Sequence, residues 1–353
     1  MSQSLVVASS ELAGFVQRLL VAAGTPAPEA NIVATALVDA DIEGLPSHGT
    51  MLLPMYLDRI CAKSVDPAAQ GKIVSDTGTQ LVIDAENALG HVVAKQAVEL
   101  VVARARAKGM AAVAVRNAFH FGAAGRFARQ IALGGCAGIV MANTRPLLPA
   151  PGGGERVVGN NPLAIAVPTQ DEPIVLDLAL SAGAMGKIRL AESQGRPLPD
   201  GWAADDQGVP TNDPTAAING MLLPAAGAKG FGLAVMIDLL AGGLSSGAIG
   251  DAVQPLYGGD LAKPYGCSNL FLAIDIAGFR PVEEFAAQAA EFGQKIKSSR
   301  RAPGAGDIRM PGDRAVKAHR EFSGDLSVAA PTVQALRDAA QRLSVPIPQQ
   351  LIA

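Results

Sequence analysis

Strand-like and helix-like segments alternate through the middle of the chain, and this alternation constrains the fold more than any other feature. The short apolar run 81–84 predicts a strand, and residues 90–109 carry apolar side chains at helical spacing. A buried strand over 111–116, a helix over 126–133 and a strand over 137–143 continue the alternation. Segments that alternate in this way pack helices against a sheet, so the sequence predicts a layered α/β fold.

Helical patterns predominate at both ends of the chain. Near the N-terminus, apolar residues three and four positions apart predict helices over 11–20 and 28–40. Near the C-terminus, the same spacing predicts helices over 282–297 and 331–343. The intervening segments are strand candidates at 163–168 and 173–177, a segment at 195–224 expected to be irregular, and an apolar helix at 227–244.

The composition is that of a globular protein. Of the 353 residues, 49% are hydrophobic and 17% are charged, and the net charge is -3. This near balance gives no indication of nucleic-acid or membrane-surface binding. The N-terminus lacks a secretory pattern and Asp238 interrupts the apolar run 231–244, so we expect a cytoplasmic protein. The three cysteines lack metal-ligand spacing, and no metal site is predicted.

Two of the four histidines have neighbours that are typical of active sites. His48 lies between Ser47 and Gly49 after a predicted helix, and His120 precedes a glycine-rich segment. Imidazole gains and loses a proton near neutral pH, so either ring suits acid–base catalysis. The alternative for each is a structural histidine that is hydrogen-bonded within a loop.

The segment 121–126 combines glycines with the start of a predicted helix. Main-chain N–H groups at a helix N-terminus bind anions, so the segment suits a dinucleotide pyrophosphate as well as plain close packing. The sequence contains no strand-linked Gly-x-Gly-x-x-Gly, which disfavours an ordinary Rossmann domain.

Three further polar residues lie beside glycine or other small residues. Asn160 is on a predicted turn, where its amide binds substrate oxygens or satisfies its own backbone. Lys187 follows a run of small residues, and Lys229 precedes a predicted helix. Each lysine either binds an anion or is a solvated surface cation.

Taken in order, these segments resemble the malate/L-lactate dehydrogenase type 2 family, which also contains sulfolactate, ureidoglycolate and diketogulonate oxidoreductases and cyclic ketimine carboxylate reductases. The resemblance extends from about residue 8 to residue 345. Each motif is weak by itself, but the motifs occur in register along the chain. They are Ser47–Gly49, Asn117–Gly125, Gly159–Pro162, Asp177–Ser181 with Gly186 and Lys187, Gly201-Trp202, Lys229–Gly232 and Met310–Asp313.

The resemblance implies a nicotinamide-dependent oxidoreductase that binds NAD or NADP in a non-Rossmann fold and forms a homodimer. It implies that His48 is the acid–base residue, with Ser47 beside it. His120 would flank the nicotinamide and the substrate, and Lys187 would complete the catalytic set. A positioned imidazolium that neutralises the developing negative charge accelerates such a reaction by roughly 10²–10⁴-fold.

The resemblance also implies a set of cofactor contacts, made largely by main-chain groups. The residues expected to hold the cofactor are Ala124, Gly125, Asp177, Leu178, Ala179, Lys229, Gly230, Pro311 and Gly312.

The residues expected to contact the substrate depart from the family pattern. Many relatives have a carboxylate-binding arginine where this chain has Leu52, and leucine cannot make charge-assisted hydrogen bonds. Either another cation, such as Arg59 or Arg145, binds the carboxylate, or the substrate carries its polar groups elsewhere. Asn160 replaces the usual threonine. Lys187 resembles the hydroxy-acid branch, because the ketimine reductases have an aspartate there.

We therefore expect an NAD(P)-dependent dehydrogenase that moves hydride between the cofactor and a small 2-oxo or 2-hydroxy acid of the malate or lactate type. Two alternatives stay open, a reductase of cyclic ketimine carboxylates and a non-catalytic binding protein with the same fold. We expect residues 1–70 and 282–353 to form a helical and dimerisation domain. Residues 71–281 are expected to form the α/β cofactor- and substrate-binding region, a large mixed sheet flanked by helices.

Overall fold

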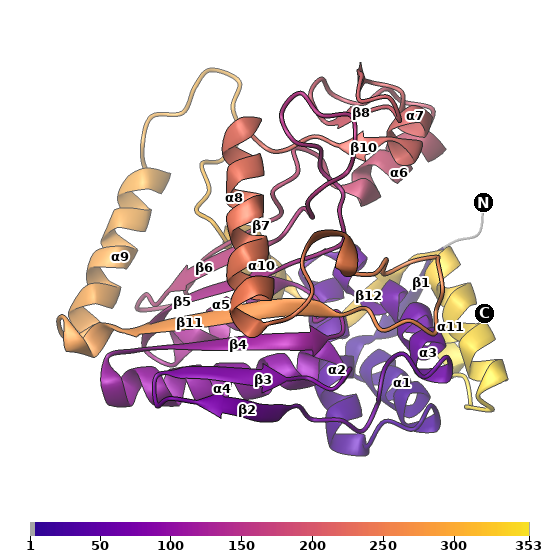
Figure 1. The fold of residues 1–353 in the computed structure, drawn as a ribbon, viewed down its shortest axis with the longest axis horizontal. Coiled ribbons are helices and arrows are strands. Elements are labelled where there is room, and N and C mark those ends of the chain that lie inside the picture. Colours follow the sequence, from indigo (N-terminus) through magenta and orange to yellow (C-terminus); the bar gives the residue numbers. More distant parts are fainter. Residues whose placement is uncertain (1–3, 353) are drawn as a thin grey trace.

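A seven-stranded mixed sheet forms the centre of the protein, whose structure is a computed structural model that describes residues 4–352 (Figure 1). Its strands are β2 (Lys72–Asp76), β3 (Gln80–Asp84), β4 (Met110–Ala118), β5 (Cys136–Ala142), β6 (Leu163–Val167), β7 (Ile174–Leu178) and β11 (Cys267–Asp275). They are ordered β2-β3-β4-β11-β5-β6-β7 across the sheet. Within this sheet β3 and β4 run parallel, and every other neighbouring pair runs antiparallel. The predicted α/β architecture is thus confirmed as a mixed sheet with helices.

The central strand of the sheet, β11, is absent from the sequence-based predictions. It pairs with β4 on one side and with β5 on the other, although more than a hundred residues separate it from both along the chain. Most of its residues are buried, so the polar and apolar alternation of a half-exposed strand is missing. Pattern analysis therefore had no local signal for this strand.

Two helices cover one face of the sheet. They are α4 (Gly90–Lys108), which connects the parallel strands β3 and β4, and α5 (Ala124–Leu133). In α4 the buried residues Val93, Ala97 and Val101 recur every four positions and form the apolar face that packs against β4 and β11. In α5, the buried residues Phe127 and Ile131 belong to the apolar face that packs against β5 and β6.

The opposite face of the sheet carries α8 (Ala228–Asp238), which stands across the strands in Figure 1. The helix continues into a π-helical turn over Leu239–Gly243. Ala241 in this turn packs against Ala114 of β4 and Leu270 of β11. Within residues 4–352, no helix combines the length and apolarity needed to cross a membrane.

The two ends of the chain meet beside the sheet (Figure 1). Strand β1 (Leu5–Ala8) pairs antiparallel with β12 (Asp325–Val328), and α3 (Leu53–Cys61) contacts α11 (Ala330–Arg342). The predicted helices at 11–20 and 28–40 are confirmed as α1 (Ser9–Ala22) and α2 (Ala27–Ile42). The predicted helix at 282–297 is α9 (Val282–Lys297), but it lies at the far end of the sheet from α11 (Figure 1). The division into 1–70 with 282–353 and 71–281 stays a prediction.

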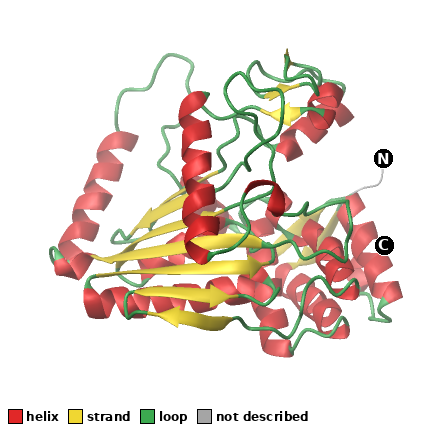
Figure 2. Ribbon diagram, in the orientation of Figure 1, coloured by secondary structure: helices red, strands yellow, loops and turns green. Residues whose placement is uncertain are grey.

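A small separate body stands above the sheet and is visible in Figure 2 as a cluster of short helices and strands. It consists of α6 (Met185–Ser193), α7 (Pro214–Asn219) and a three-stranded sheet of β8 (Ala203–Ala204), β9 (Pro210–Thr211) and β10 (Met221–Leu222). Its apolar core includes Ile188, Leu198 and Leu222, and continues into Ala234 and Ile237 of α8. The expectation of an irregular segment at 195–224 is therefore wrong in part, because strands of two residues are too short to show periodicity.

Candidate active site

His48 lies on a tight turn that a partly buried carboxylate stabilises. After α2 the chain forms two short 3₁₀ turns, Pro46–His48 and Thr50–Leu52. Asp41 accepts hydrogen bonds at Oδ2 from the Thr50 N–H (3.0 Å) and the Thr50 hydroxyl (2.6 Å). A Cβ on Gly49 would lie 1.9 Å from Asp41 Oδ1, so only glycine allows this close approach. The glycine of the Ser-His-Gly motif therefore fixes the position of the histidine.

The side chain of His48 contacts both residues that the sequence associated with it. The Ser47 Oγ lies 3.1 Å from His48 Nδ1. The His48 and His120 rings are stacked with centroids 6.0 Å apart and an interplanar angle of 27°. Burial lowers the pKa of His48, and the negative charge of Asp177 partly opposes that shift. The two predicted histidines thus meet at one place, although 72 residues separate them in sequence.

His120 follows β4 after a left-handed residue, Asn117, whose φ is 53°. The Asn117 amide donates to both carboxylate oxygens of Asp84, at 3.0 and 3.1 Å, which holds the end of the strand. The Tyr56 hydroxyl lies 2.7 Å from His120 Nδ1. Burial, together with the charge of His48, lowers the pKa of His120 to about 3.

Tyr56 was not identified from the sequence as a residue of the site. It lies on the buried face of α3 between Leu53 and Leu57, where a tyrosine reads as an ordinary core residue. The tyrosine hydroxyl is the one feature of the sequence that could indicate a role beyond core packing, because a buried hydroxyl requires a hydrogen-bond partner.

Asp177 brings two predicted cofactor segments together. Its Oδ2 accepts a hydrogen bond of 2.8 Å from the N–H of Gly125, in the first turn of α5. A Cβ on Gly125 would lie 2.7 Å from that oxygen, so the glycine permits the contact. Desolvation by the surrounding protein raises the pKa of Asp177, whereas the Gly125 N–H and the charge of His48 oppose the rise. The end of β7 and the start of α5 therefore lie beside His48.

Main-chain hydrogen bonds connect further predicted residues at this edge of the sheet. The N–H of Leu180 donates to the Asn160 carbonyl, and the N–H of Ala225 donates to the Leu180 carbonyl, both at 2.8 Å. Segment 178–180 therefore lies between Asn160 and the loop that leads into α8. Gly230 is buried there, and a Cβ on it would lie 2.0 Å from the Ala225 carbonyl oxygen.

Pro311 and Gly312 lie along the outer edge of β7. The N–H of Val175 donates to the Pro311 carbonyl at 3.3 Å. Gly312 has a φ of 89° and immediately precedes α10 (Asp313–Glu321). These two residues are thus adjacent to the strand that contains Asp177.

Lys187 lies in the separate body above the sheet, in the first turn of α6. Its ammonium group lies 5.9 Å from the centroid of the Trp202 ring, within cation–π range. In the described part of the chain, no hydrogen bond or ion pair connects Lys187 to His48 or His120.

Two residues expected to contact the substrate are instead structural. Leu52 is 0% exposed and lies in the main core. Arg59 is 1% exposed, and its guanidinium donates to the main-chain carbonyls of Pro255, Lys263 and Leu261 at 2.5, 3.0 and 3.2 Å. The proposal that Arg59 binds a substrate carboxylate is therefore corrected, because its donors hold the loop at 255–263.

Arg145 is the other cation that the sequence offered for the substrate carboxylate. Its side chain is half-buried, and no carboxylate within residues 4–352 lies at ion-pair distance from it. Burial lowers the pKa of Arg145, and the nearby charges of Arg156 and Arg189 lower it further. A half-buried guanidinium without an anion is suited to bind an acidic ligand.

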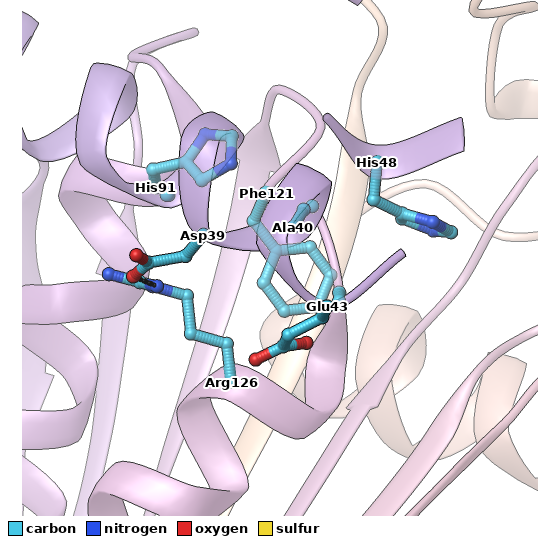
Figure 3. Close-up of a pocket in the computed structure, with 10 residues that line it drawn as sticks. Asp39, Ala40, Glu43, His48, His91, Phe121 and Arg126 are labelled. Carbon is cyan, nitrogen blue, oxygen red and sulfur yellow. Dashed lines mark hydrogen bonds and ion pairs between the residues drawn. The ribbon is translucent and has the colours of Figure 1, made fainter. Parts of the chain in front are cut away.

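A cavity of about 10 Å³ lies beside His48 between α2 and α5, and Figure 3 shows its lining. Asp39 and Arg126 form an ion pair on one side of it, and the ring of His48 points away from that pair (Figure 3). The cavity holds about one water molecule. It is far too small for a dinucleotide. Within residues 4–352, no cluster of three His, Cys, Asp or Glu side chains could bind a metal ion.

Comparison with known proteins assigns the chain to a family. The family described as malate/L-lactate dehydrogenase matches residues 7–337. The chain belongs to the malate/L-lactate dehydrogenase family. This membership confirms the resemblance seen in the sequence and the expected class of enzyme, an oxidoreductase of the dehydrogenase type.

Several known proteins are similar to this chain over most of their length. The malate dehydrogenase of Pyrococcus abyssi is 36% identical over 316 residues, which cover 87% of this chain and 86% of that protein. The (2R)-3-sulfolactate dehydrogenase (NADP(+)) of Chromohalobacter salexigens is 36% identical over 320 residues, 90% of this chain and 93% of that protein. The solved sulfolactate dehydrogenase of Methanocaldococcus jannaschii superimposes with a TM-score of 0.91 at 31% identity, covering 97% of this chain and 98% of that one. The predicted dependence on a nicotinamide dinucleotide agrees with the NADP(+) in the name of the Chromohalobacter salexigens enzyme.

Proposed function

We propose that this chain is an NAD(P)-dependent 2-hydroxy-acid dehydrogenase in which His48 is the acid–base residue. The observation that carries this proposal is the meeting of His48 with His120 and Asp177 at one edge of the sheet. The main-chain segments expected to hold the cofactor lie at the same edge.

The start of α8 fits the pyrophosphate of a dinucleotide. Ala226 and Gly227 adopt φ values of 53° and 61° directly before the helix, whose first N–H groups have no partner within it. A Cβ at Gly227 would meet no atom within 4 Å, so the space beside it is open. Lys229 is exposed in the same turn. Free amides and a cation at a helix N-terminus attract phosphate, which supports a cofactor site here.

When bound, the nicotinamide supplies the hydride acceptor or donor for the reaction. In the oxidation direction His48 accepts the proton of the substrate hydroxyl. The carbon that bears this hydroxyl would give its hydride to the oxidised cofactor, and a 2-oxo acid forms. In the reduction direction His48 returns that proton to the substrate oxygen as hydride arrives at the carbon. Because burial lowers the pKa of His48, the ring is mainly neutral near pH 7 and suited to act as a base.

We assign the substrate carboxylate to Arg145. Its half-buried guanidinium has no carboxylate partner among the described residues, whereas both terminal nitrogens of the Arg59 guanidinium donate to main-chain carbonyls. The amide oxygen of Asn160 accepts a hydrogen bond of 3.1 Å from the hydroxyl of Thr144, the residue before Arg145, which supports a contact between the Asn160 side chain and the same substrate. Lys187, on the body above the sheet, would approach the substrate from the opposite side.

The topology supports cofactor binding outside a Rossmann fold, because a Rossmann sheet is largely parallel and this sheet has one parallel pair.

Exposed apolar side chains support the homodimer. Met236 on α8 is 49% exposed, Leu239 in the π-helical turn after it is 47% exposed, and Phe292 on α9 is 61% exposed. Large apolar groups that stay in water in one protomer are typical of a surface that a second copy covers.

A substrate panel with both cofactors tests the proposal. Pyruvate, oxaloacetate, a bulky aryl 2-oxo acid and a cyclic ketimine carboxylate are each supplied with NADH and with NADPH, and the absorbance of the reduced cofactor is followed. We expect turnover with one or more 2-oxo acids. Turnover of the cyclic ketimine alone would favour the reductase alternative. Calorimetry that detects no binding of NADH or NADPH would favour a non-catalytic protein.

A further inference from the structure

Tyr56 is a fully buried residue whose hydroxyl has a single partner. The side chain is 0% exposed, and its oxygen lies 2.7 Å from His120 Nδ1. Among residues 4–352 no other hydrogen bond involves this hydroxyl. The ring also packs edge-on against Phe119, with centroids 5.1 Å apart, so its position is fixed on two sides.

This geometry decides which of the two atoms donates. If His120 Nδ1 carried the proton, the tyrosine oxygen would accept it, and the proton of the tyrosine itself would be buried without an acceptor. A buried donor without a partner costs about 1–3 kcal/mol. The arrangement that satisfies both groups has the Tyr56 O–H donating to Nδ1. Burial raises the pKa of Tyr56 well above its usual value, so the hydroxyl keeps its proton.

The same bond determines the state of the rest of the His120 ring. A neutral imidazole carries one proton, so when Nδ1 accepts, the proton is on Nε2. No residue among those described is hydrogen-bonded to Nε2. The titratable groups that face the ring are His48, Tyr56 and His91, and the cationic forms of His48 and His91 would repel a second positive charge.

We propose that Tyr56 is a positioning residue that holds His120 as the neutral Nε2–H tautomer, so that His120 donates a hydrogen bond to the reacting oxygen of the substrate while His48 alone exchanges the proton. The two stacked histidines then have different tasks. His48, beside the Ser47 hydroxyl, changes its charge during the reaction, and His120 stabilises negative charge as a neutral donor. The part of this inference that concerns the substrate rests on the proposed function.

The tautomer can be measured without any substrate or cofactor. The full chain is labelled with ¹⁵N-histidine, and long-range ¹H–¹⁵N correlations are recorded for wild type, Tyr56→Phe and, as a matched control, Tyr265→Phe. Tyr265 is also buried and packs against Phe119, but no hydrogen bond connects it to a histidine. His120→Gln assigns the signal, since the chain has only four histidines.

We expect wild-type His120 to carry its proton on Nε2 at neutral pH. In Tyr56→Phe, the Nδ1 resonance should move to the position of a nitrogen without a hydrogen bond, and Tyr265→Phe should leave it unchanged. A proton on Nδ1 in the wild type, a charged ring, or an Nδ1 resonance that Tyr56→Phe does not move would each overturn the inference.

Kinetics test the role in catalysis. An amide N–H of glutamine can replace a neutral imidazole donor but cannot replace an acid–base group, so His120→Gln should retain at least tenfold more kcat than His120→Ala. The alanine variant should lose about 10²–10³-fold, as for the removal of an oxyanion donor. Tyr56→Phe should lower kcat about tenfold, because His120 loses the hydrogen bond that orients its ring. The Kd of NADH should be unchanged.

Equal loss in the glutamine and alanine variants would overturn the donor role of His120. The outcomes separate the two proposals, since the NMR measurement needs no turnover. If no 2-oxo acid reacts but the tautomer responds to Tyr56→Phe as expected, the proposed substrate class fails and the Tyr56–His120 relationship stands.

Discussion

The carboxylate of Asp177 accepts a 2.8 Å hydrogen bond from the N–H of Gly125 and also interacts electrostatically with His48. One side chain at the end of β7 thereby connects the first turn of α5 with the proposed acid–base residue. The negative charge opposes the effect of burial, so it lessens the lowering of the pKa of His48.

Replacing Asp177 with asparagine should move the pH profile to lower pH. The asparagine oxygen can still accept from Gly125, but the charge that raises the pKa of His48 is gone. The limb that rises with pH in the oxidation direction, and the limb that falls with pH in the reduction direction, should both shift to lower pH. Initial rates across pH 4–9 check this, with Asp76→Asn as a surface control at its ion pair with Arg104. An unmoved limb would disprove the coupling.

Replacing His48 with alanine should remove the proton transfer while leaving the cofactor site intact. We expect kcat to fall by about 10²–10⁴-fold in both directions, with little change in the Kd of NADH or NADPH. Stopped-flow rates and calorimetric titration measure the two quantities. The control is His319→Ala, an exposed histidine on α10 that interacts with Glu43. Near-native turnover in the His48 variant would refute the assignment.

Replacing Arg145 with leucine should weaken substrate binding more than it slows the chemical step. A hydrogen bond to a charged group contributes about 1.5–3 kcal/mol, which corresponds to a KM about 10–100-fold higher for 2-oxo acids. Steady-state kinetics check this against Arg280→Leu, which removes an exposed cation paired with Glu284. A KM equal to that of the wild type would show that another group binds the carboxylate.

Replacing Lys187 with alanine should likewise raise KM, and by less than the arginine variant. Lys187 lies on the separate body above the sheet, where its contact is the Trp202 ring, so its charge reaches a substrate only from that side. We expect a rise of about threefold to tenfold with kcat largely preserved. Unaltered kinetics with every substrate in the panel would remove Lys187 from the site.

Replacing Arg59 with methionine should destabilise the protein without a direct effect on substrate affinity. Methionine fills similar volume, but the carbonyls of Pro255, Leu261 and Lys263 lose their charged donor. We expect the free energy of unfolding to fall by about 3 kcal/mol. Chemical denaturation measures this loss. Arg104→Met, which breaks an exposed ion pair, should cost about 0–1 kcal/mol. Equal losses in the two variants would contradict the anchoring role.

The sequence by itself determined most helices and half-exposed strands. Helices such as α1, α2, α4 and α5 bury one face, so apolar residues recur at helical spacing and can be read locally. The family motifs were also readable, because the Ser-His-Gly and glycine-rich segments are local. Two of these motif residues, Ser47 and Gly125, have hydrogen-bond partners within the site, His48 and Asp177.

Only the tertiary structure decided the position of β11 in the sheet, the hydrogen-bond partners of Arg59 and the hydrogen-bond partner of His120. β11 lies between strands more than a hundred residues away, and Arg59 donates to carbonyls about two hundred residues later in the chain. Tyr56 and His120 are 64 positions apart. Local periodicity reports only whether a position is buried. It does not report what the buried polar atom meets, because the partner comes from a distant segment that chain folding brings to it.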